Sequence, residues 1–446
     1  MATRLRTLLG AVVLIAVFAA PGAARAEFIT GIDETTLFTS PDATERNRWF
    51  DTTVDLNAGI VRINLSWSRL VTGRPANPGD PADPAYKLET IDAAVESAAQ
   101  HDLDVLLTFF RAPIFAEGGA RPASAVPGSW KPDPGALGEF ARAVATRYSG
   151  SFEGLPRVRY FEAWNEPNVD YFLAPQTVGG QSFMPGHYRK MLNAVAEGVH
   201  SVHPDNAVIG PSTAPYGDAP GGSRTRPLTF MRELFCLDDG LDPVDCPTKP
   251  QLDLFSHHPI NLSGGPRQSA IDPDDASTPD LKHAIEILRA AEKAGTIQSD
   301  RRRLPVWVTE IWWVKKLEEQ ARFVAESTYL LWKQGAEVVI QFMLRDSPKV
   351  EDLDSGLYFV DGSPKPSAAS FRFPFVTDRK SKRTLFAWGK APSRGKVRIQ
   401  RLKKGDWSTI GKAKAGGDGV FTAKLRLRGS PSLRARSGRD VSPVWR

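Results

Sequence analysis

Residues 160–168 read Tyr-Phe-Glu-Ala-Trp-Asn-Glu-Pro-Asn. This apolar run ends in an Asn-Glu pair, and Pro167 closes it because proline cannot join the hydrogen bonding of a central strand. Residues 306–313 read Val-Trp-Val-Thr-Glu-Ile-Trp-Trp and repeat the arrangement, with Glu310 flanked by indoles. Both stretches are typical of a buried strand that carries a carboxylate at its end. In a parallel barrel such ends face one common mouth, so the pattern predicts that Glu166 and Glu310 point into it.

Short apolar runs alternate with amphipathic helical stretches from Glu27 onward, which indicates a parallel sheet built from strand-helix units. Eight strands are expected, at residues 28–33, 60–65, 104–109, 157–164, 207–211, 252–257, 305–309 and 337–344. Helical periodicity is clear at residues 91–99, 137–148, 188–203, 281–294 and 319–334. The fold class is therefore predicted as α/β, a (β/α)8 or TIM barrel. A doubly wound open sheet is the alternative, although no Gly-rich phosphate loop follows the first strand.

The last 70 residues have a different texture, in which apolar and basic residues alternate strictly between Gly clusters, as at residues 424–428. This alternation predicts a small antiparallel, sandwich-like β-domain at residues 377–446, behind a catalytic barrel at residues 27–376. The domain carries 20 Lys and Arg against four acidic residues, a net charge of +16, whereas residues 27–376 carry −13. We expect it to bind an anionic cell-wall or matrix polymer. The alternatives are the acidic barrel as its target, or a merely solubilising surface.

The first 26 residues have the features of a secretory signal peptide: arginines at 4 and 6, an apolar run at 8–20 and small residues at the cleavage positions. The mature chain is expected to begin at Glu27 and to be secreted, with association to a cell surface as a further option. A retained N-terminal anchor is the alternative; no later segment is apolar enough to span a membrane. Export favours a disulfide between Cys236 and Cys246 over two free thiols, and makes nucleic acid an unexpected partner.

Two carboxylates on opposite walls of a barrel mouth suit hydrolysis of a glycosidic bond by double displacement, in which one donates a proton and the other attacks. This mechanism requires a carboxyl separation of roughly 5–5.5 Å. Arg62, at the centre of an apolar strand, needs a buried partner and could keep the attacking carboxylate ionised. A purely structural salt bridge is the alternative. No residue cluster has the spacing of a metal site, and the chemistry needs no cofactor.

At these residues the chain resembles the retaining glycoside hydrolases of clan A. Within the clan it is most similar to the β-xylosidase and α-iduronidase branch and its relatives acting on bacterial exopolysaccharide. The resemblance spans most of residues 28–376 and is carried by residues 138–148, 157–168 and 188–210.

The resemblance implies roles for individual residues. Glu166 would be the acid/base, Glu310 the nucleophile, and Asn165 would hydrogen-bond the 2-hydroxyl of the sugar. His258 matches a histidine of the sixth strand, where Ile260 replaces the tyrosine that the family often has near its nucleophile. The eighth strand lacks the tryptophan common at its end, so the floor of the sugar site is expected to be atypical.

Aromatic residues near strand ends could stack on sugar rings, and about half of them are expected to line the cleft. The main candidates are Trp67, Tyr216, Trp312 and Trp313. Arg111, after the third strand, could bind an anionic sugar or an acidic neighbour. The sequence thus predicts a secreted retaining glycoside hydrolase that acts on a poly- or oligosaccharide. The alternatives are a non-catalytic glycan-binding protein, and a transglycosylase that uses the same residues.

Overall fold

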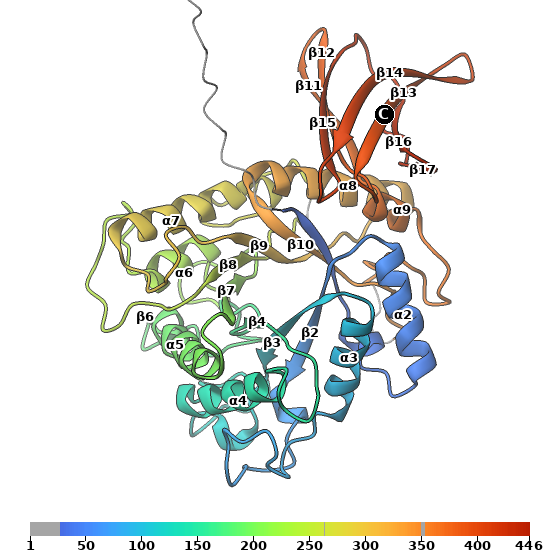
Figure 1. Cartoon of the computed structure of the whole chain (residues 1–446). Helices are drawn as coiled ribbons and strands as arrows, with labels where there is room; N and C mark the ends of the chain where they lie inside the picture. Colours follow the sequence, from blue (N-terminus) through green and yellow to red (C-terminus); the bar gives the residue numbers. More distant parts are fainter. Residues whose placement is uncertain (1–26, 263, 349–352) are drawn as a thin grey trace, which may run out of the picture.

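The computed structural model describes residues 27–262, 264–348 and 353–446, so the predicted signal peptide lies outside the described residues. Eight parallel strands close into a barrel in the order β1-β10-β9-β8-β7-β4-β3-β2 (Figure 1). The strands are β1 (Ile29–Asp33), β2 (Ile60–Ser66), β3 (Asp104–Phe110), β4 (Tyr160–Glu162), β7 (Ala207–Thr213), β8 (Leu254–His257), β9 (Val306–Ile311) and β10 (Ala336–Phe342). The predicted (β/α)8 barrel is confirmed, and the open sheet is excluded by closure of β1 onto both β2 and β10.

Helices surround the barrel as Figure 1 shows. They are α1 (Thr35–Phe38), α2 (Ala43–Asp55), α3 (Glu89–Gln100), α4 (Pro134–Arg147), α5 (Met184–Val202), α6 (Pro227–Leu234), α7 (Leu281–Ala294), α8 (Leu317–Gln334) and α9 (Pro366–Arg372). Local sequence explains their ends. The side chain of Asp133 caps the first turn of α4, and Pro134 occupies its first position, where no backbone donor is needed. Gly295 and Gly335 end α7 and α8 in the left-handed conformation that glycine adopts freely.

The interior of the barrel changes character from one end to the other. Inward-facing residues near the N-terminal ends of the strands form an apolar cluster, which includes Ile60, Leu106 and Trp307. Two residues further along the same strands, the inward positions are Arg62, Thr108 and Thr309, all fully buried. Side chains alternate along a strand, so this step of two residues keeps the same face. The polar end is therefore the C-terminal end, where barrel enzymes place their chemistry.

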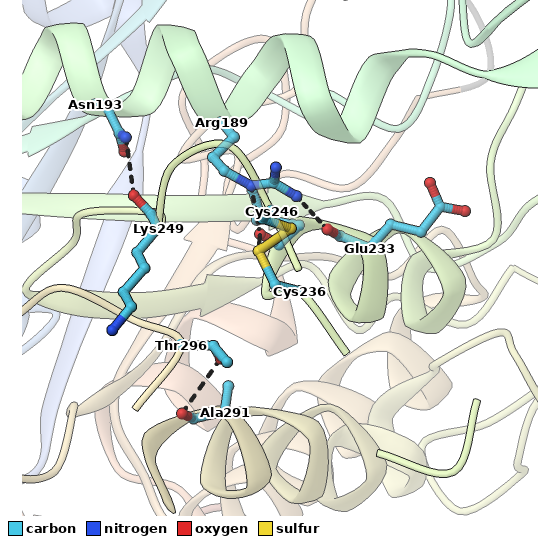
Figure 2. Close-up of a disulfide and its surroundings, with 9 residues drawn as sticks. Arg189, Asn193, Glu233, Cys236, Cys246, Lys249, Ala291 and Thr296 are labelled. Carbon is cyan, nitrogen blue, oxygen red and sulfur yellow. Dashed lines mark hydrogen bonds between the residues drawn. A yellow bond between two sulfur atoms is a disulfide. The ribbon is translucent and has the colours of Figure 1, made fainter. Parts of the chain in front are cut away.

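The predicted disulfide between Cys236 and Cys246 is confirmed (Figure 2). It closes the loop after α6, and the buried Arg189 of α5 reaches into the same region. Its guanidinium donates to the carbonyl of Leu234, at 2.9 Å, and to that of Glu233. These are carbonyls at the C-terminal end of α6, which have no partner within the helix, so a cation there is favourable.

The C-terminal strands form two antiparallel sheets. One has the order β11-β12-β15 and the other β14-β13-β16-β17. Their bounds are β11 (Phe375–Ser381), β12 (Thr384–Lys390), β13 (Gly395–Lys403), β14 (Asp406–Ala415), β15 (Val420–Arg426), β16 (Leu433–Ser437) and β17 (Asp440–Val441). Buried residues from both sheets, among them Phe375, Val397, Phe421 and Leu433, form a separate core. The predicted small antiparallel β-domain is thus confirmed.

The β-domain is docked beside α8 (Figure 1). Trp388 of β12 is fully buried, with ring centroids 5.6 Å from Tyr329 and 5.5 Å from Trp332, both on α8. The Tyr329 hydroxyl donates to Asp378 of β11 at 3.0 Å. Searched along its whole described part, the chain offers no helix with the length and apolar character that crossing a bilayer demands.

Candidate active site

A cavity of about 680 Å³ opens at the C-terminal ends of the barrel strands. Five of the residues singled out in the sequence line it: Asn165, Glu166, Tyr216, Glu310 and Trp312. The substitutions noted on strands six and eight are also visible here, because Ile260, Phe342 and Met343 line the cavity. The mouth of the barrel therefore combines Glu166 and Glu310, together with the further carboxylates of Asp33 and Glu34, with an aromatic and apolar wall.

Glu166 and Glu310 approach each other closely in this cavity. One oxygen of each carboxylate and a ring nitrogen of His258 all lie within 4.8 Å of one another. Glu310 belongs to β9, whereas Glu166 follows β4 with a positive φ of 43°. Its backbone N–H donates to the carbonyl of Ser212 at 3.1 Å, which holds this uncommon conformation. Strands on opposite walls thus bring together residues 144 positions apart in the sequence.

Arg62 lies beneath the cavity and joins its acidic groups. Its side chain is fully buried, with Nη1 2.5 Å from Asp33 and 3.2 Å from Glu310. Its Nη2 lies 2.7 Å from Glu162 and donates to Oδ1 of Asn165, also at 2.7 Å. Arg62 does not line the cavity. We therefore describe it as a positioning residue for Glu310 and Asn165, not as a direct contact of substrate.

Glu162 is the fully buried anion of this network. Burial acts to raise its pKa, but the charge of Arg62 and hydrogen bonds with Ser212 and Thr309 outweigh burial and lower it below the ordinary value. Ser212 donates to Oε1 at 2.5 Å, and Thr108 donates to Oε2 at 2.8 Å. Glu162 is thus ionised at neutral pH and accepts hydrogen bonds only.

His258 connects Glu166 to this network through hydrogen bonds of its two ring nitrogens. Its Nε2 lies 3.0 Å from the Thr309 hydroxyl, and its Nδ1 lies 3.0 Å from Oε1 of Glu166. Burial lowers the pKa of His258, so the imidazole is neutral. Thr309 helps to lower the pKa of Glu162, so we infer that its single hydroxyl proton is directed to that carboxylate and that its oxygen accepts from Nε2–H of the histidine. Nδ1 then carries a lone pair, and the hydrogen bond to Glu166 requires the proton to be on the glutamic acid.

Glu310 has the opposite surroundings, because both of its oxygens accept hydrogen bonds. Arg62 donates to Oε2, and the indole of Trp312 donates to Oε1 at 3.0 Å. Burial raises the pKa of Glu310 to about 7 and that of Glu166 to about 7. Two carboxyl groups this close share one proton at neutral pH. The donors around Glu310 and the acceptor beside Glu166 place that proton on Glu166.

Two aromatic candidates from the sequence lie elsewhere, which corrects the prediction that they bind sugar. Trp67 is 2% exposed and stacks on Phe140, with centroids 5.1 Å apart. Trp313 is 1% exposed, and its indole donates to Ser327 of α8 at 3.2 Å. Both belong to the layer between strands and helices. Arg111 donates to the carbonyl of Tyr171 and lies over its ring, 4.3 Å from the centroid.

Sequence reasoning missed Asp33, Glu162 and Ser212. Glu162 gave the same signal as Arg62, a charged residue within an apolar strand, because its neighbours are Phe161 and Ala163. A buried charge requires a partner of opposite sign, so an ion pair between Arg62 and Glu162 could have been predicted. Ser212 gave no such signal, since a serine at the end of a strand is common.

Donor chemistry alone would also allow a metal ion between Glu166, His258 and Glu310. Arg62 argues against this, because its guanidinium already contacts the Glu310 oxygen that is 3.8 Å from the histidine ring. A divalent cation would lie beside a fixed positive charge, and the ordered hydrogen bonds above account for all three side chains without one.

No model of a known protein family matches the sequence. No curated protein matches it either. Solved structures do share its fold. A family 39 glycoside hydrolase from the gut symbiont Bacteroides cellulosilyticus WH2 aligns with a TM-score of 0.56 and 18% identity, over 90% of this chain and 79% of that chain.

Two further structures align over most of both chains. The GH39 enzyme from Xanthomonas axonopodis pv. citri gives a TM-score of 0.53 and 13% identity, over 94% of each chain. A GH30 endoxylanase from Clostridium papyrosolvens C71 gives 0.52 and 12%, over 90% of this chain and 95% of that chain. At these identities the likeness establishes the fold, and the resemblance inferred from the sequence is confirmed at that level.

Proposed function

We propose that the protein is a retaining glycoside hydrolase that cleaves O-glycosidic bonds of an oligo- or polysaccharide. One observation carries the proposal: an oxygen of Glu166 and an oxygen of Glu310 lie within 4.8 Å across the barrel mouth. Retaining enzymes need about 5–5.5 Å between their carboxyl groups, whereas inverting enzymes leave a wider gap for a water molecule. The names of the aligned structures, glycoside hydrolases of families 39 and 30, support the same activity.

In the first step of the proposed reaction, Glu310 attacks the anomeric carbon while Glu166 protonates the departing oxygen. The C–O bond to the leaving group breaks, and an ester forms between the sugar and Glu310. In the second step Glu166, now ionised, removes a proton from water, which attacks the same carbon and releases Glu310. Two inversions give net retention. Arg62 holds Oδ1 of Asn165, so the amide NH2 of Asn165 is the end left to donate to a sugar hydroxyl.

The rest of the cavity suits a carbohydrate. Sugar rings present apolar faces edged by hydroxyl groups, and Trp312 offers an indole beside the nucleophile for such a face. Tyr216 also lines the wall and adds a second aromatic ring. Ile260 and Met343 add apolar surface. The reaction as proposed needs no cofactor, and chelation of metal ions should leave activity unchanged.

The test is a panel of polysaccharides and aryl glycosides, together with 2-deoxy-2-fluoro glycosides that trap the covalent intermediate. We expect turnover of at least one substrate, and a labelled peptide that contains Glu310. A protein that binds glycans without turnover or labelling would instead be a glycan-binding protein. Product lengthening in the presence of sugar acceptors would identify a transglycosylase that uses the same residues.

We also propose that the enzyme is secreted, with a catalytic barrel followed by an accessory β-domain whose first strand, β11 (Phe375–Ser381), begins two residues before the predicted start at residue 377. The signal-like sequence of residues 1–26 and the disulfide support this proposal. Mass spectrometry of protein recovered from culture medium should give an N-terminus at Glu27. Full-length protein found only with the cells would contradict export.

A further inference from the structure

The two faces of the C-terminal sandwich have different neighbours. The sheet β11-β12-β15 packs against the barrel through Phe386 and Trp388, whose rings contact Tyr329 of α8. The other sheet covers the opposite side of the domain core, and only its end reaches the barrel, where Asp440 of β17 pairs with Arg372 of α9 at 2.8 Å. Its residues Val397 and Ile399 point inward and are buried. Lys396 and Arg398, which alternate with them, point outward and are exposed, so this sheet presents a free face to solvent.

That outer face is basic. Inward positions alternate with outward ones on each strand, and the outward positions are paired in register across the sheet. The six cations on this face, which we call the basic face, are Lys396 and Arg398 of β13, Lys412 and Lys414 of β14, and Arg434 and Arg436 of β16. Five of the six are exposed, and Arg434 is half-buried.

The cations of the basic face stand directly opposite one another. Arg398 is paired with Lys412 on one side and with Arg436 on the other, and Lys396 is paired with Lys414. Like charges opposite each other on neighbouring strands destabilise a sheet. Lysines on the edge strand β14 would guard against edge-to-edge aggregation, but this does not explain Lys396 and Arg398 on the central strand β13. The folded domain alone gives no reason for this arrangement.

No carboxylate in the described part of the chain forms an ion pair with any of these six side chains. Arg434 is nevertheless held in place. Its guanidinium carbon lies 4.0 Å from the ring centroid of Trp407, and its Nε donates to Gln400 at 2.9 Å. The two Nη groups are thus free and oriented, which suits two-point recognition of a carboxylate.

We propose that the basic face binds a linear acidic polysaccharide through its carboxylate groups. Outward side chains repeat about every 7 Å along a strand and about 5 Å between strands, a regular grid along which a polyanionic chain can lie. The choice of a polysaccharide over other polyanions rests on the proposed glycosidase function. The domain contacts the N-terminal side of the barrel, where Lys390 donates to the carbonyl of Asn57 at 3.2 Å. A chain bound on the basic face leaves the cavity mouth open.

The test uses the full mature chain with Glu310→Gln, so that binding is measured without turnover and independently of the hydrolase proposal. The probe is polygalacturonate, with dextran as the uncharged comparison. The face variant is Arg398→Thr, Lys412→Thr and Arg436→Thr. The matched control removes three exposed cations outside the basic face, Lys382→Ser, Arg383→Ser and Arg428→Ser. Both variants therefore have the same net charge.

At physiological ionic strength we expect the face variant to bind polygalacturonate at least about tenfold more weakly, and the control less than about twofold. Neither should bind dextran. The melting temperature of the face variant should not fall, because like-charge pairs are removed. Equal losses in the two variants, or no loss in either, would overturn the proposal. Tighter binding of double-stranded DNA than of polygalacturonate, lost in the face variant, would overturn the assignment to polysaccharide.

Discussion

The barrel mouth and the basic face use charge in opposite ways. At the mouth, Arg62 is fully buried and contacts three carboxylates, those of Asp33, Glu162 and Glu310. On the basic face, Arg398 stands between two other cations and has no acidic partner in the described chain. Fixed, opposed charges in a buried site can set which group holds a proton. Exposed, unopposed charges cannot do this, but they remain available to an external polyanion.

Loss of Glu310, the proposed nucleophile, should have the largest effect on activity and should leave the basic face unchanged. Glu310→Gln keeps the shape of the side chain but removes the attacking anion, so we expect kcat to fall by at least about 10⁴-fold. Binding of polygalacturonate should not change. Azide or formate should restore turnover to Glu310→Ala. A Glu310→Gln variant that keeps more than a few per cent of activity would remove Glu310 from the role of nucleophile.

Loss of Glu166, the proposed acid/base, should have an effect that depends on the leaving group. With Glu166→Ala we expect poor leaving groups to react about 10²–10⁴-fold more slowly, because general-acid assistance matters when the departing oxygen is basic. Activated aryl glycosides should lose far less in the first step. The measurement is kcat/KM across a series of aryl leaving groups. A uniform loss across the series would indicate that Glu166 only positions the substrate.

The proton arrangement predicts a pH profile of kcat/KM with limbs on either side of pH 7. Activity falls at low pH as Glu310 is protonated, and at high pH as Glu166 ionises; burial raises both pKa values to about 7. Thr309→Val removes the acceptor of His258 Nε2–H, so the histidine can instead donate from Nδ1 to ionised Glu166. The alkaline limb should then move about one unit lower.

Thr309→Ser is the control for this change, because it keeps the hydroxyl group and should keep the alkaline limb in place. If the valine variant leaves the alkaline limb unmoved, or moves it to higher pH, the hydrogen-bonded chain from Glu162 through Thr309 and His258 does not set the proton on Glu166.

Salt concentration should affect the two regions differently, and the effect on hydrolysis at the barrel mouth should be the smallest of those predicted here. Buried pairs are screened little, so hydrolysis of an uncharged aryl glycoside should change less than about twofold between about 0.05 and 0.5 M salt. Binding of polygalacturonate to the basic face should weaken steeply over the same range. If the hydrolysis rate and the affinity for polygalacturonate changed with salt to the same extent, the proposed difference between the two regions would be contradicted.

The sequence was sufficient for the barrel because its strands are continuous apolar runs. Predicted and observed bounds agree closely for β2 and β3, and α7 agrees at both ends. The strand containing Glu162 was predicted too long, because only Tyr160–Glu162 pair within the barrel. Among the flanking residues, Val158, Ala163 and Trp164 are apolar because they pack in the core, and a sequence pattern does not distinguish packing from strand pairing.

The site was predicted only in part, for two physical reasons. Trp312 and Trp313 are adjacent, and successive side chains point to opposite sides of an extended chain, so one reaches the cavity and the other the core. Composition does not reveal which is which. Arg62 meets Asp33 and Glu162 across separations of 29 and 100 residues, and such pairings depend on barrel closure. By contrast, the positions of Glu166 and Glu310 at strand ends could be predicted from the pattern of parallel strands alone.

The most direct test of the central claim is the configuration of the first product, followed by ¹H NMR as soon as a substrate is turned over. Close carboxyl groups at Glu166 and Glu310, without room for a water molecule between them, predict that the sugar is released with the same anomeric configuration as the bond that was cleaved. Mutarotation then follows at its own slower rate. Initial release of the opposite anomer would contradict double displacement and, with it, the roles of Glu310 as nucleophile and Glu166 as acid/base.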